Sequence, residues 1–296
     1  MTTTQIRELK ERNIVIVNSD IQGHQFICMV FDFDGTVSLL REQWRRVMAQ
    51  TMVEVISGET ESSPEIQKEV ERYIEESAGI QTIYQMRHLV GLVNKYGLVP
   101  TDEVLTAEEY KEIYDHRLFK VVSEQLTMLE EDDLTRQDLT VPGVIDFLNL
   151  LRSCGVVLYV ASGTDRKYVL REATALGVAH YFQGIYAPDP TLPDYSKSWL
   201  VRKVIEWHNL TPGELLVVGD GPVEIVVAKK QGSFALGVAS TEKPEGGLNS
   251  TKRQVLLEAG ADIIVPDFSD YRLLVDYLFS GHCGAATGSL SEKIAA

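Results

Sequence analysis

The sequence predicts an α/β fold, with a parallel sheet as its core and a mainly helical domain inserted into it. Three short apolar runs predict the sheet, at residues 27–31, 156–161 and 215–218. Each run is rich in branched side chains and stops at glycine or polar residues, which is typical of buried strands in a parallel sheet. The stretch between the first two runs is far longer than one crossover needs, so it predicts an inserted domain.

Two carboxylates follow the first apolar run directly. Residues 27–31 lead into Asp32-Phe33-Asp34-Gly35-Thr36, which places Asp32 and Asp34 where a buried strand ends. Two anions at a half-buried site repel each other unless a cation or a proton holds them. The pair therefore indicates a metal ion, a shared proton or catalytic chemistry.

Apolar residues recur at helical spacing in the segment that follows. One set comprises Leu40, Trp44, Val47, Met48, Met52, Val55 and Ile56, and a second comprises Ile83, Met86, Leu89, Val90 and Val93. Further helical patterns cover 66–74 and 107–129, and Pro142-Gly143 marks the return to the core. We therefore expect a core formed by residues 1–38 and 140–280, a helical insert at 39–139, and a disordered tail at 281–296, which is small and polar.

Polar residues also follow the second and third apolar runs. Residues 156–161 lead into Ser162-Gly163-Thr164-Asp165, and residues 215–218 lead into Gly219-Asp220, with Glu224 four residues beyond Asp220. Ligands of an open α/β sheet bind beyond the carboxyl ends of the strands, so these polar clusters should meet there. Further strands are expected at 13–18, 234–238 and 262–265, a helix at 271–279, and a loop beside the site at 240–249, where Thr241 and Lys243 could approach a ligand.

In order and spacing, four of these elements resemble the motifs of the haloacid dehalogenase (HAD) superfamily. They are Asp32-x-Asp34-Gly35-Thr36, Ser162 after an apolar strand, the lone Lys197, and Gly219-Asp220-x-x-x-Glu224. The resemblance spans roughly residues 26–240 and is specific, because four elements must fall in sequence. It implies a Rossmann-like core in which the helical insert acts as a cap domain.

The resemblance implies a phosphohydrolase mechanism. Asp32 would be the nucleophile that forms an aspartyl-phosphate, and Asp34 would protonate the leaving oxygen and later take a proton from water. Ser162, Gly163 and Lys197 would bind the phosphate, and Ser162 and Lys197 would also take part in catalysis. The Ser162 hydroxyl and the Gly163 and Thr164 N–H groups, which are expected to open the following helix, would form a site suited to an anion. Taken alone, the segment 162–165 is typical of a helix N-cap, and Lys197 is typical of a surface charge.

Magnesium is the metal that these residue types favour, because the candidate ligands are hard oxygens and no cluster of Cys or His is present. By resemblance, Mg²⁺ would be held by the Asp32 carboxylate, the Asp34 backbone carbonyl and Asp220. Glu224 lies one helical turn beyond Asp220 if a helix begins at Pro222, and we expect it in the outer shell, reaching the metal through water.

The leading expectation is a magnesium-dependent phosphatase for a small phosphorylated metabolite, with a sugar phosphate as the favoured substrate. Asp34 disfavours dehalogenase chemistry, because a halide leaving group needs no protonation. Alternatives are a phosphomutase of the β-phosphoglucomutase type, a phosphonate hydrolase with a Schiff-base lysine, and a non-catalytic binding protein of the same fold. Polar residues of the insert that could select a substrate are Arg41, Glu42, Gln81, Gln85 and Arg87, each of which also fits an ordinary helix surface.

Charge and composition limit the classes of partner that the chain is expected to bind. The formal net charge of −15 disfavours non-specific binding to nucleic acid or to anionic membranes, since both attract basic surfaces. The first ten residues contain no apolar signal core, and the longest apolar runs are of strand length, so we expect a cytoplasmic protein. The sequence carries no indication of oligomeric state.

Overall fold

The computed structural model describes residues 3–280, and its core is a seven-stranded sheet. The strand order is β1-β7-β6-β5-β2-β3-β4, with β1 antiparallel to β7 and every other pair parallel. The strands are β1 (Val15–Ile16), β2 (Cys28–Phe31), β3 (Val157–Ala161), β4 (Gly184–Tyr186), β5 (Leu215–Gly219), β6 (Phe234–Val238) and β7 (Ile263–Val265). The predicted α/β fold with a parallel, Rossmann-like core is confirmed.

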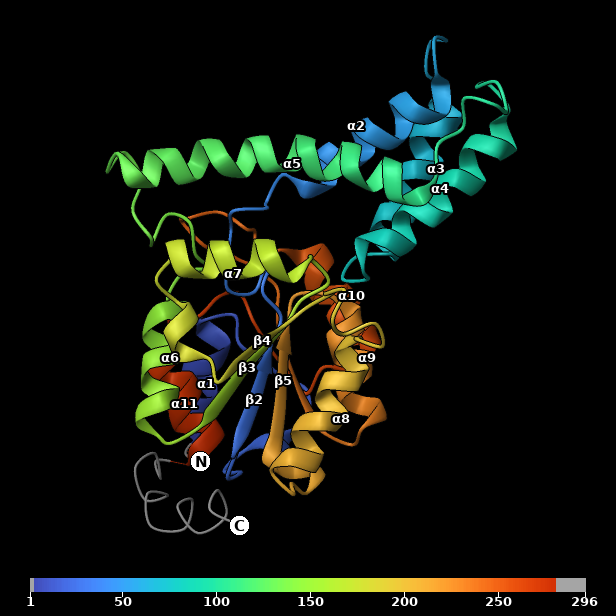
Figure 1. Cartoon of the computed structure of the whole chain (residues 1–296). Helices are drawn as coiled ribbons and strands as arrows, with labels where there is room; N and C mark the ends of the chain where they lie inside the picture. Colours follow the sequence, from blue (N-terminus) through green and yellow to red (C-terminus); the bar gives the residue numbers. More distant parts are fainter. Residues whose placement is uncertain (1–2, 281–296) are drawn as a thin grey trace. The chain divides into compact units, whose positions relative to one another are not determined.

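Helices cover both faces of this sheet (Figure 1). They are α1 (Thr3–Glu11), α6 (Val144–Ser153), α7 (Arg166–Ala175), α8 (Lys197–Trp207), α9 (Pro222–Lys230), α10 (Ser250–Ala259) and α11 (Tyr271–Phe279). Helices α8, α9 and α10 pack together on one face, and α6 contacts α11 on the other. Short 3-10 turns at Ser19–Ile21, Ala179–Tyr181 and Pro212–Glu214 complete the unit.

Alternation along the central strands explains this two-sided packing. In β2, Cys28 and Val30 belong to the apolar cluster formed with α8 and α9, whereas Phe31 contacts the ring of Phe147 of α6 at a centroid distance of 6.2 Å. All four residues of β2 are fully buried. A strand that is covered on both faces must be apolar on both faces, which is why these runs are continuous. Each such side chain contributes about 1.5–3 kcal/mol by its burial.

The chain divides into two compact units. One contains the sheet and runs to Leu40 and again from Leu134, and the other spans Arg41–Asp133. The chain leaves and re-enters the sheet unit along paired segments, since the Leu39 N–H donates to the Leu139 carbonyl at 2.9 Å and Ser38 bridges Thr140. The insert expected at 39–139 therefore corresponds to a unit of 41–133.

The second unit is made of four helices, α2 (Trp44–Ser57), α3 (Pro64–Glu76), α4 (Thr82–Tyr96) and α5 (Ala107–Glu130). Its helix ends follow local rules. Ser63 caps α3 just before Pro64, and Thr106 forms a capping box with Glu109 at the start of α5. Gly97, with φ of +61°, ends α4 in the left-handed conformation that glycine adopts without cost. The four helical patterns in the sequence are thus confirmed as helices.

Some expectations need comment. Strand β4 and helix α1 have no counterpart among the expected elements. The tail at 281–296 lies outside the described residues. Between residues 3 and 280, no helix combines the length and the apolar character that crossing a membrane requires.

Candidate active site

The carboxyl ends of three neighbouring strands bring the predicted polar clusters together. Strand β2 lies between β3 and β5, and Phe31 is in register with both Val160 and Val218. The strands are parallel, so Asp32, Ser162 and Asp220 all follow carboxyl ends of adjacent strands. This is where an open α/β sheet binds its ligands.

Lys197 links two of the predicted carboxylates. Its Nζ lies 2.9 Å from Asp32 Oδ1, and it also donates to Glu224 Oε1. Lys197 opens helix α8, where Ser196 is the N-cap, and all three charged side chains are buried. The structure thus contradicts the ordinary interpretation of Lys197 as a surface charge, since a buried ammonium needs carboxylate partners.

Burial and neighbouring charges set the protonation of this cluster. Burial raises the pKa of Asp32 well above its usual range, Lys197 lowers it, and Glu224 and Asp220 raise it again. Burial would lower the pKa of Lys197, but Asp32 and Glu224 together raise it above the ordinary value of a lysine. Lys197 therefore stays charged. Its single positive charge is less than the combined negative charge of the carboxylates around it, so the pKa of Asp32 remains raised.

Asp34 and Ser162 are connected through Thr164. The Thr164 hydroxyl donates to Asp34 Oδ2 at 2.9 Å, and the Thr164 backbone N–H donates to Ser162 Oγ at 3.0 Å. Ser162 is fully buried, and its carbonyl accepts from the Tyr195 hydroxyl at 2.9 Å. The sequence assigned no role to the Thr164 side chain, yet Thr164 contacts both Asp34, the predicted acid, and Ser162, a predicted phosphate ligand.

The helix after Ser162 begins later than expected. Helix α7 starts at Arg166, with Asp165 at its N-cap position, so Gly163 and Thr164 precede the helix rather than opening it. The expectation that both N–H groups lie at a helix N-terminus is wrong, because the helix begins at Arg166. The Thr164 N–H donates to Ser162 Oγ instead. Gly163 is half-buried, and its backbone N–H stays a candidate for binding an anion.

Glycines allow the motif loops to approach the carboxylates. Gly35 has φ of +75°, and a Cβ added there would collide with the Asp220 carboxylate. A Cβ at Gly219 would likewise collide with the Glu224 side chain. These two glycines therefore let Asp220 and Glu224 lie directly against the loops that carry them.

A second buried lysine reaches the site from outside the four motifs. Lys252 Nζ lies 2.5 Å from Asp220 Oδ2 and 2.6 Å from Glu242 Oε1. Burial would lower the pKa of Lys252, but Asp220 and Glu242 raise it. The expected loop at 240–249 borders the site through Glu242, which contacts Lys252 of helix α10. That Thr241 and Lys243 approach a ligand stays a prediction. Only its position in that loop could have pointed to Glu242 in the sequence.

The donor set around Asp32 and Asp220 fits a divalent cation. Among the described residues, Glu224 Oε2 is buried and has no hydrogen-bond partner, and every candidate ligand is a hard oxygen. Three buried carboxylates, Asp32, Glu224 and Glu242, and the partly buried Asp220 surround two lysines. When all four are ionised, they leave two negative charges in excess of the two ammonium groups. Over residues 3–280 no group of three His, Cys, Asp or Glu side chains is arranged to hold a metal ion by itself.

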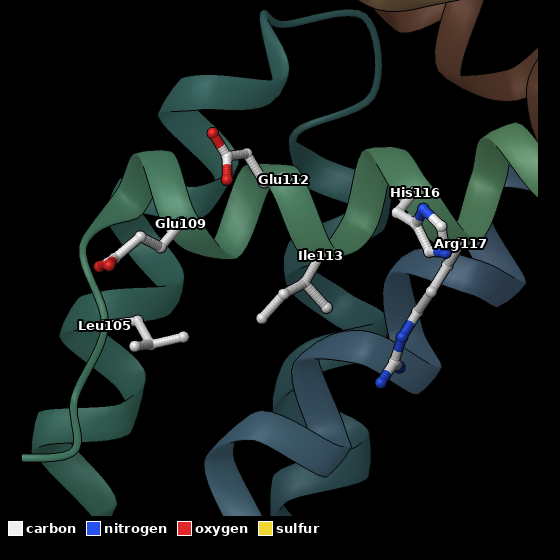
Figure 2. A pocket seen from close by; sticks show the side chains of 6 residues that line it. All are labelled: Leu105, Glu109, Glu112, Ile113, His116 and Arg117. Atoms are coloured by element: carbon white, nitrogen blue, oxygen red, sulfur yellow. The ribbon is translucent and has the colours of Figure 1, made fainter.

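The helical unit has an open hollow of its own (Figure 2). It has a volume of about 420 Å³ and is lined by Leu105, Glu109, Glu112, Ile113, His116 and Arg117, most of them from helix α5. None of the predicted site residues lines it. Of the polar residues considered for substrate selection, Gln85 is buried and donates to Ser77 Oγ at 3.0 Å, so it serves the packing of this unit.

Comparison with known proteins places the chain in a family. A family model described as haloacid dehalogenase-like hydrolase matches residues 28–232. A phosphoglycolate phosphatase from Vibrio cholerae is 28% identical over 102 residues, which are 33% of this chain and 43% of the relative. The chain spans about half the length, 43% to 55%, of the curated relatives that it matches.

Solved structures share the fold at lower identity. A crystal structure described as a predicted phosphoglycolate phosphatase from Haemophilus somnus has a TM-score of 0.58 at 20% identity, and the match covers 85% of this chain and 98% of the other. The β-phosphoglucomutase of Clostridium difficile has a TM-score of 0.53 at 15% identity, with 92% and 100% covered. Because the family model covers most of the sheet unit and all four motif segments, this chain belongs to the haloacid dehalogenase-like hydrolase family.

Proposed function

We propose that this chain is a magnesium-dependent phosphatase that hydrolyses a small phosphorylated metabolite through an aspartyl-phosphate, with sugar phosphates as the leading substrate class. One observation carries the proposal. A buried lysine, Lys197, bridges the Asp32 carboxylate and Glu224 at the carboxyl edge of the sheet, with Asp34 and Asp220 beside them. Burying an ionic group costs free energy on folding, so a cluster of such groups at the carboxyl ends of the strands supports a catalytic role.

Asp32 is suited to act as the nucleophile. One of its oxygens, Oδ1, is held by Lys197, and its backbone N–H donates to the Val218 carbonyl at 2.8 Å, which fixes the residue between two strands. In the proposed reaction an Asp32 carboxylate oxygen attacks phosphorus, and the bond from phosphorus to the leaving oxygen breaks. The Lys197 ammonium would lie beside the phosphoryl group and stabilise the negative charge that develops on its oxygens.

Asp34 is suited to act as acid and then as base. The Thr164 hydroxyl donates to Oδ2 of Asp34, so the other oxygen is the one that carries and transfers the proton. Asp34 would give this proton to the leaving oxygen and later take one from the water that attacks the phosphoaspartate. Such proton transfer contributes about 10²- to 10⁴-fold to a rate.

Phosphate and metal would be held by the remaining motif residues. The Ser162 hydroxyl, the Gly163 backbone and Lys197 would bind the phosphoryl oxygens. The Asp32 carboxylate, the Asp34 carbonyl and Asp220 would hold Mg²⁺, with Glu224 further out, although the contact of Glu224 with Lys197 gives it a second role. When bound, Mg²⁺ supplies positive charge that keeps Asp32 ionised and offsets charge on the phosphoryl group.

The choice of a small phosphorylated substrate rests on the relatives and on the inserted unit, and the choice of a sugar phosphate among them rests on the family resemblance alone. The curated relative from Vibrio cholerae carries the name of a phosphatase for phosphoglycolate, a small phosphorylated acid. We propose that residues 39–139 form a cap domain that selects the substrate and excludes water during turnover, and that small substrates follow from such a cap. The net charge of −15 supports a small-molecule partner over nucleic acid or membrane.

A panel of phosphorylated compounds tests the function. The full chain would be assayed for phosphate release from phosphorylated sugars, nucleotides, phosphonates and small acids, with Mg²⁺ or with a chelator. Release from one chemical group, lost with the chelator, is the expected result. Conversion of a sugar phosphate into its isomer without net release would replace the phosphatase by a mutase, and no turnover of any compound would contradict the proposal.

A further inference from the structure

Lys252 is enclosed at the edge of the predicted metal site without belonging to any of the four motifs. Its side chain is buried in the first turn of helix α10, and its ammonium lies 2.5 Å from Asp220 Oδ2 and 2.6 Å from Glu242 Oε1. Lysine is almost never fully buried unless it is paired. The position of the ammonium is therefore set by these two carboxylates.

The local backbone is built to bring the three side chains together. Asn249 caps α10 by accepting from the Lys252 backbone N–H at 3.0 Å, which fixes where the lysine leaves the helix. Glu242 has φ of +59°, an uncommon conformation for a residue with a long side chain, and its N–H donates to the buried Ser240 Oγ at 3.0 Å. A strained residue held by a buried side chain indicates that the direction of the Glu242 side chain matters.

We propose that Lys252, held in turn by Glu242, is a positioning residue that fixes the Asp220 carboxylate for divalent metal binding. This inference rests on the proposed function only in that Asp220 is taken as a metal ligand. Lys252 occupies Oδ2 of Asp220, and in this proposal Oδ1 is the oxygen that binds the cation. Gly35 also packs against the carboxylate, closer to Oδ2 than to Oδ1.

The arrangement mirrors that of Lys197. Each buried lysine lies between two carboxylates, Lys197 between the buried Asp32 and Glu224, and Lys252 between the partly buried Asp220 and the buried Glu242. In each pair one carboxylate is a predicted metal ligand. Groups that hold a ligand by hydrogen bonds fix its orientation, and their removal typically weakens metal affinity by about 10- to 100-fold.

The test measures metal binding and not turnover. Mn²⁺ is added to the full chain, and the loss of the electron paramagnetic resonance signal of free Mn²⁺ gives a Kd. For Lys252→Met, which keeps the length of the side chain but removes its charge, we expect a Kd about 10- to 100-fold higher than that of the wild type. Lys229→Met is the matched control, because Lys229 also pairs with a buried carboxylate, Asp262 at 2.7 Å, outside the motifs, and it should leave the Kd unchanged.

A second variant guards against a folding defect. Lys252→Met leaves Glu242 buried without its lysine, which can destabilise the chain. Lys252→Met combined with Glu242→Gln removes that unpaired charge and should show the same weakening of Mn²⁺ binding. A folded variant of either kind with wild-type Kd would overturn the inference, and so would failure of both to fold, since Lys252 would then serve the fold.

The outcomes separate this inference from the proposed function. If the variant binds Mn²⁺ more weakly but the wild type releases no phosphate from any compound, the role of Lys252 stands and the phosphatase proposal falls. If the wild type binds no Mn²⁺, both fall. If the wild type binds Mn²⁺ and releases phosphate while Lys252→Met binds equally well, only the role of Lys252 is contradicted.

Discussion

At the scale of single residues, the predicted site is held by neighbours that no motif contains. Thr164 contacts Asp34 and Ser162, and Lys252 contacts Asp220. The chemistry depends on these contacts because a catalytic carboxylate must present one defined oxygen to its substrate or metal.

Thr164→Val tests the contact with Asp34 at this scale. Loss of a hydrogen bond to a carboxylate is worth about 1.5–3 kcal/mol, so kcat should fall by about 10- to 100-fold while KM changes little. In the proposed mechanism Asp34 protonates the leaving oxygen, so the loss should be larger for alkyl phosphates than for aryl phosphates, whose leaving groups need less protonation. Steady-state phosphate release from one ester of each kind measures it.

Thr164→Ser is the control, because it keeps the hydroxyl that donates to Asp34. It should restore most of the rate. Equal losses for alkyl and aryl esters in Thr164→Val would mean that Thr164 only supports the fold, and Asp34 would then lose its positioning partner in this account.

The sequence predicts where the motif residues lie in the fold better than it predicts the residues that contact them. Asp32, Ser162 and Asp220 could be placed together because each follows an apolar run, and parallel strands carry their carboxyl ends to one edge. Thr164, Glu242 and Lys252 could not, since their roles depend on the path of loops whose conformation no short pattern fixes. The outer-shell position of Glu224 stays a prediction, although its contact with Lys197 was not expected.

At the scale of elements, burial on both faces decides how well the sequence predicts the sheet. Strands β2, β3, β5 and β6 begin and end within a residue or so of the apolar runs, because they are buried on both faces. In strand β4, Gly184–Tyr186 at the edge, only Ile185 is buried, so the sequence shows no continuous apolar run there. Strand β1 is found at Val15–Ile16 inside the range expected for an edge strand.

Gly143 tests how tightly the sheet unit is built where the chain returns from the insert. It has φ of +74° before helix α6, and a Cβ there would collide with the backbone of Phe268. Gly97 has a similar φ of +61°, but nothing lies near its added Cβ. Both Ala variants carry the backbone penalty, about 1 kcal/mol, and Gly143→Ala should lose about 1–3 kcal/mol more, because backbone atoms of Phe268 must shift. Urea denaturation followed by circular dichroism measures the difference, and equal losses for the two variants would contradict the packing described around α6.

At the scale of the whole molecule, the chain is a sheet unit interrupted by a helical unit at residues 41–133. The contacts that hold the motif residues, Lys197 with Asp32 and Glu224, and Thr164 with Asp34, lie within the sheet unit. The insert could be predicted from its length and helical spacing, whereas the burial of Gln85 and its hydrogen bond with Ser77 could not. Which residues of the insert select a substrate stays a prediction.

Removal of the insert tests this division of labour. The two connecting segments lie side by side, held by the backbone hydrogen bond from the Leu39 N–H to the Leu139 carbonyl. A Gly-Ser linker in place of 41–133 should therefore leave a folded sheet unit. We expect it to retain phosphate release from a small aryl phosphate, and to lose about tenfold or more in kcat/KM for the preferred metabolite, because remote contacts with a substrate contribute to its turnover. Unchanged preference among the panel would contradict a selecting role for the insert.

The nucleophile is the centre of this account, and Asp32→Asn tests it most directly. Phosphate release by the variant and the wild type would be compared with Mg²⁺ on the best substrate of the panel, with circular dichroism to show that both are folded. Loss of a catalytic nucleophile costs several orders of magnitude, so the account predicts a rate at least about 10⁴-fold lower. A folded Asp32→Asn chain that releases phosphate at a rate near that of the wild type would contradict it.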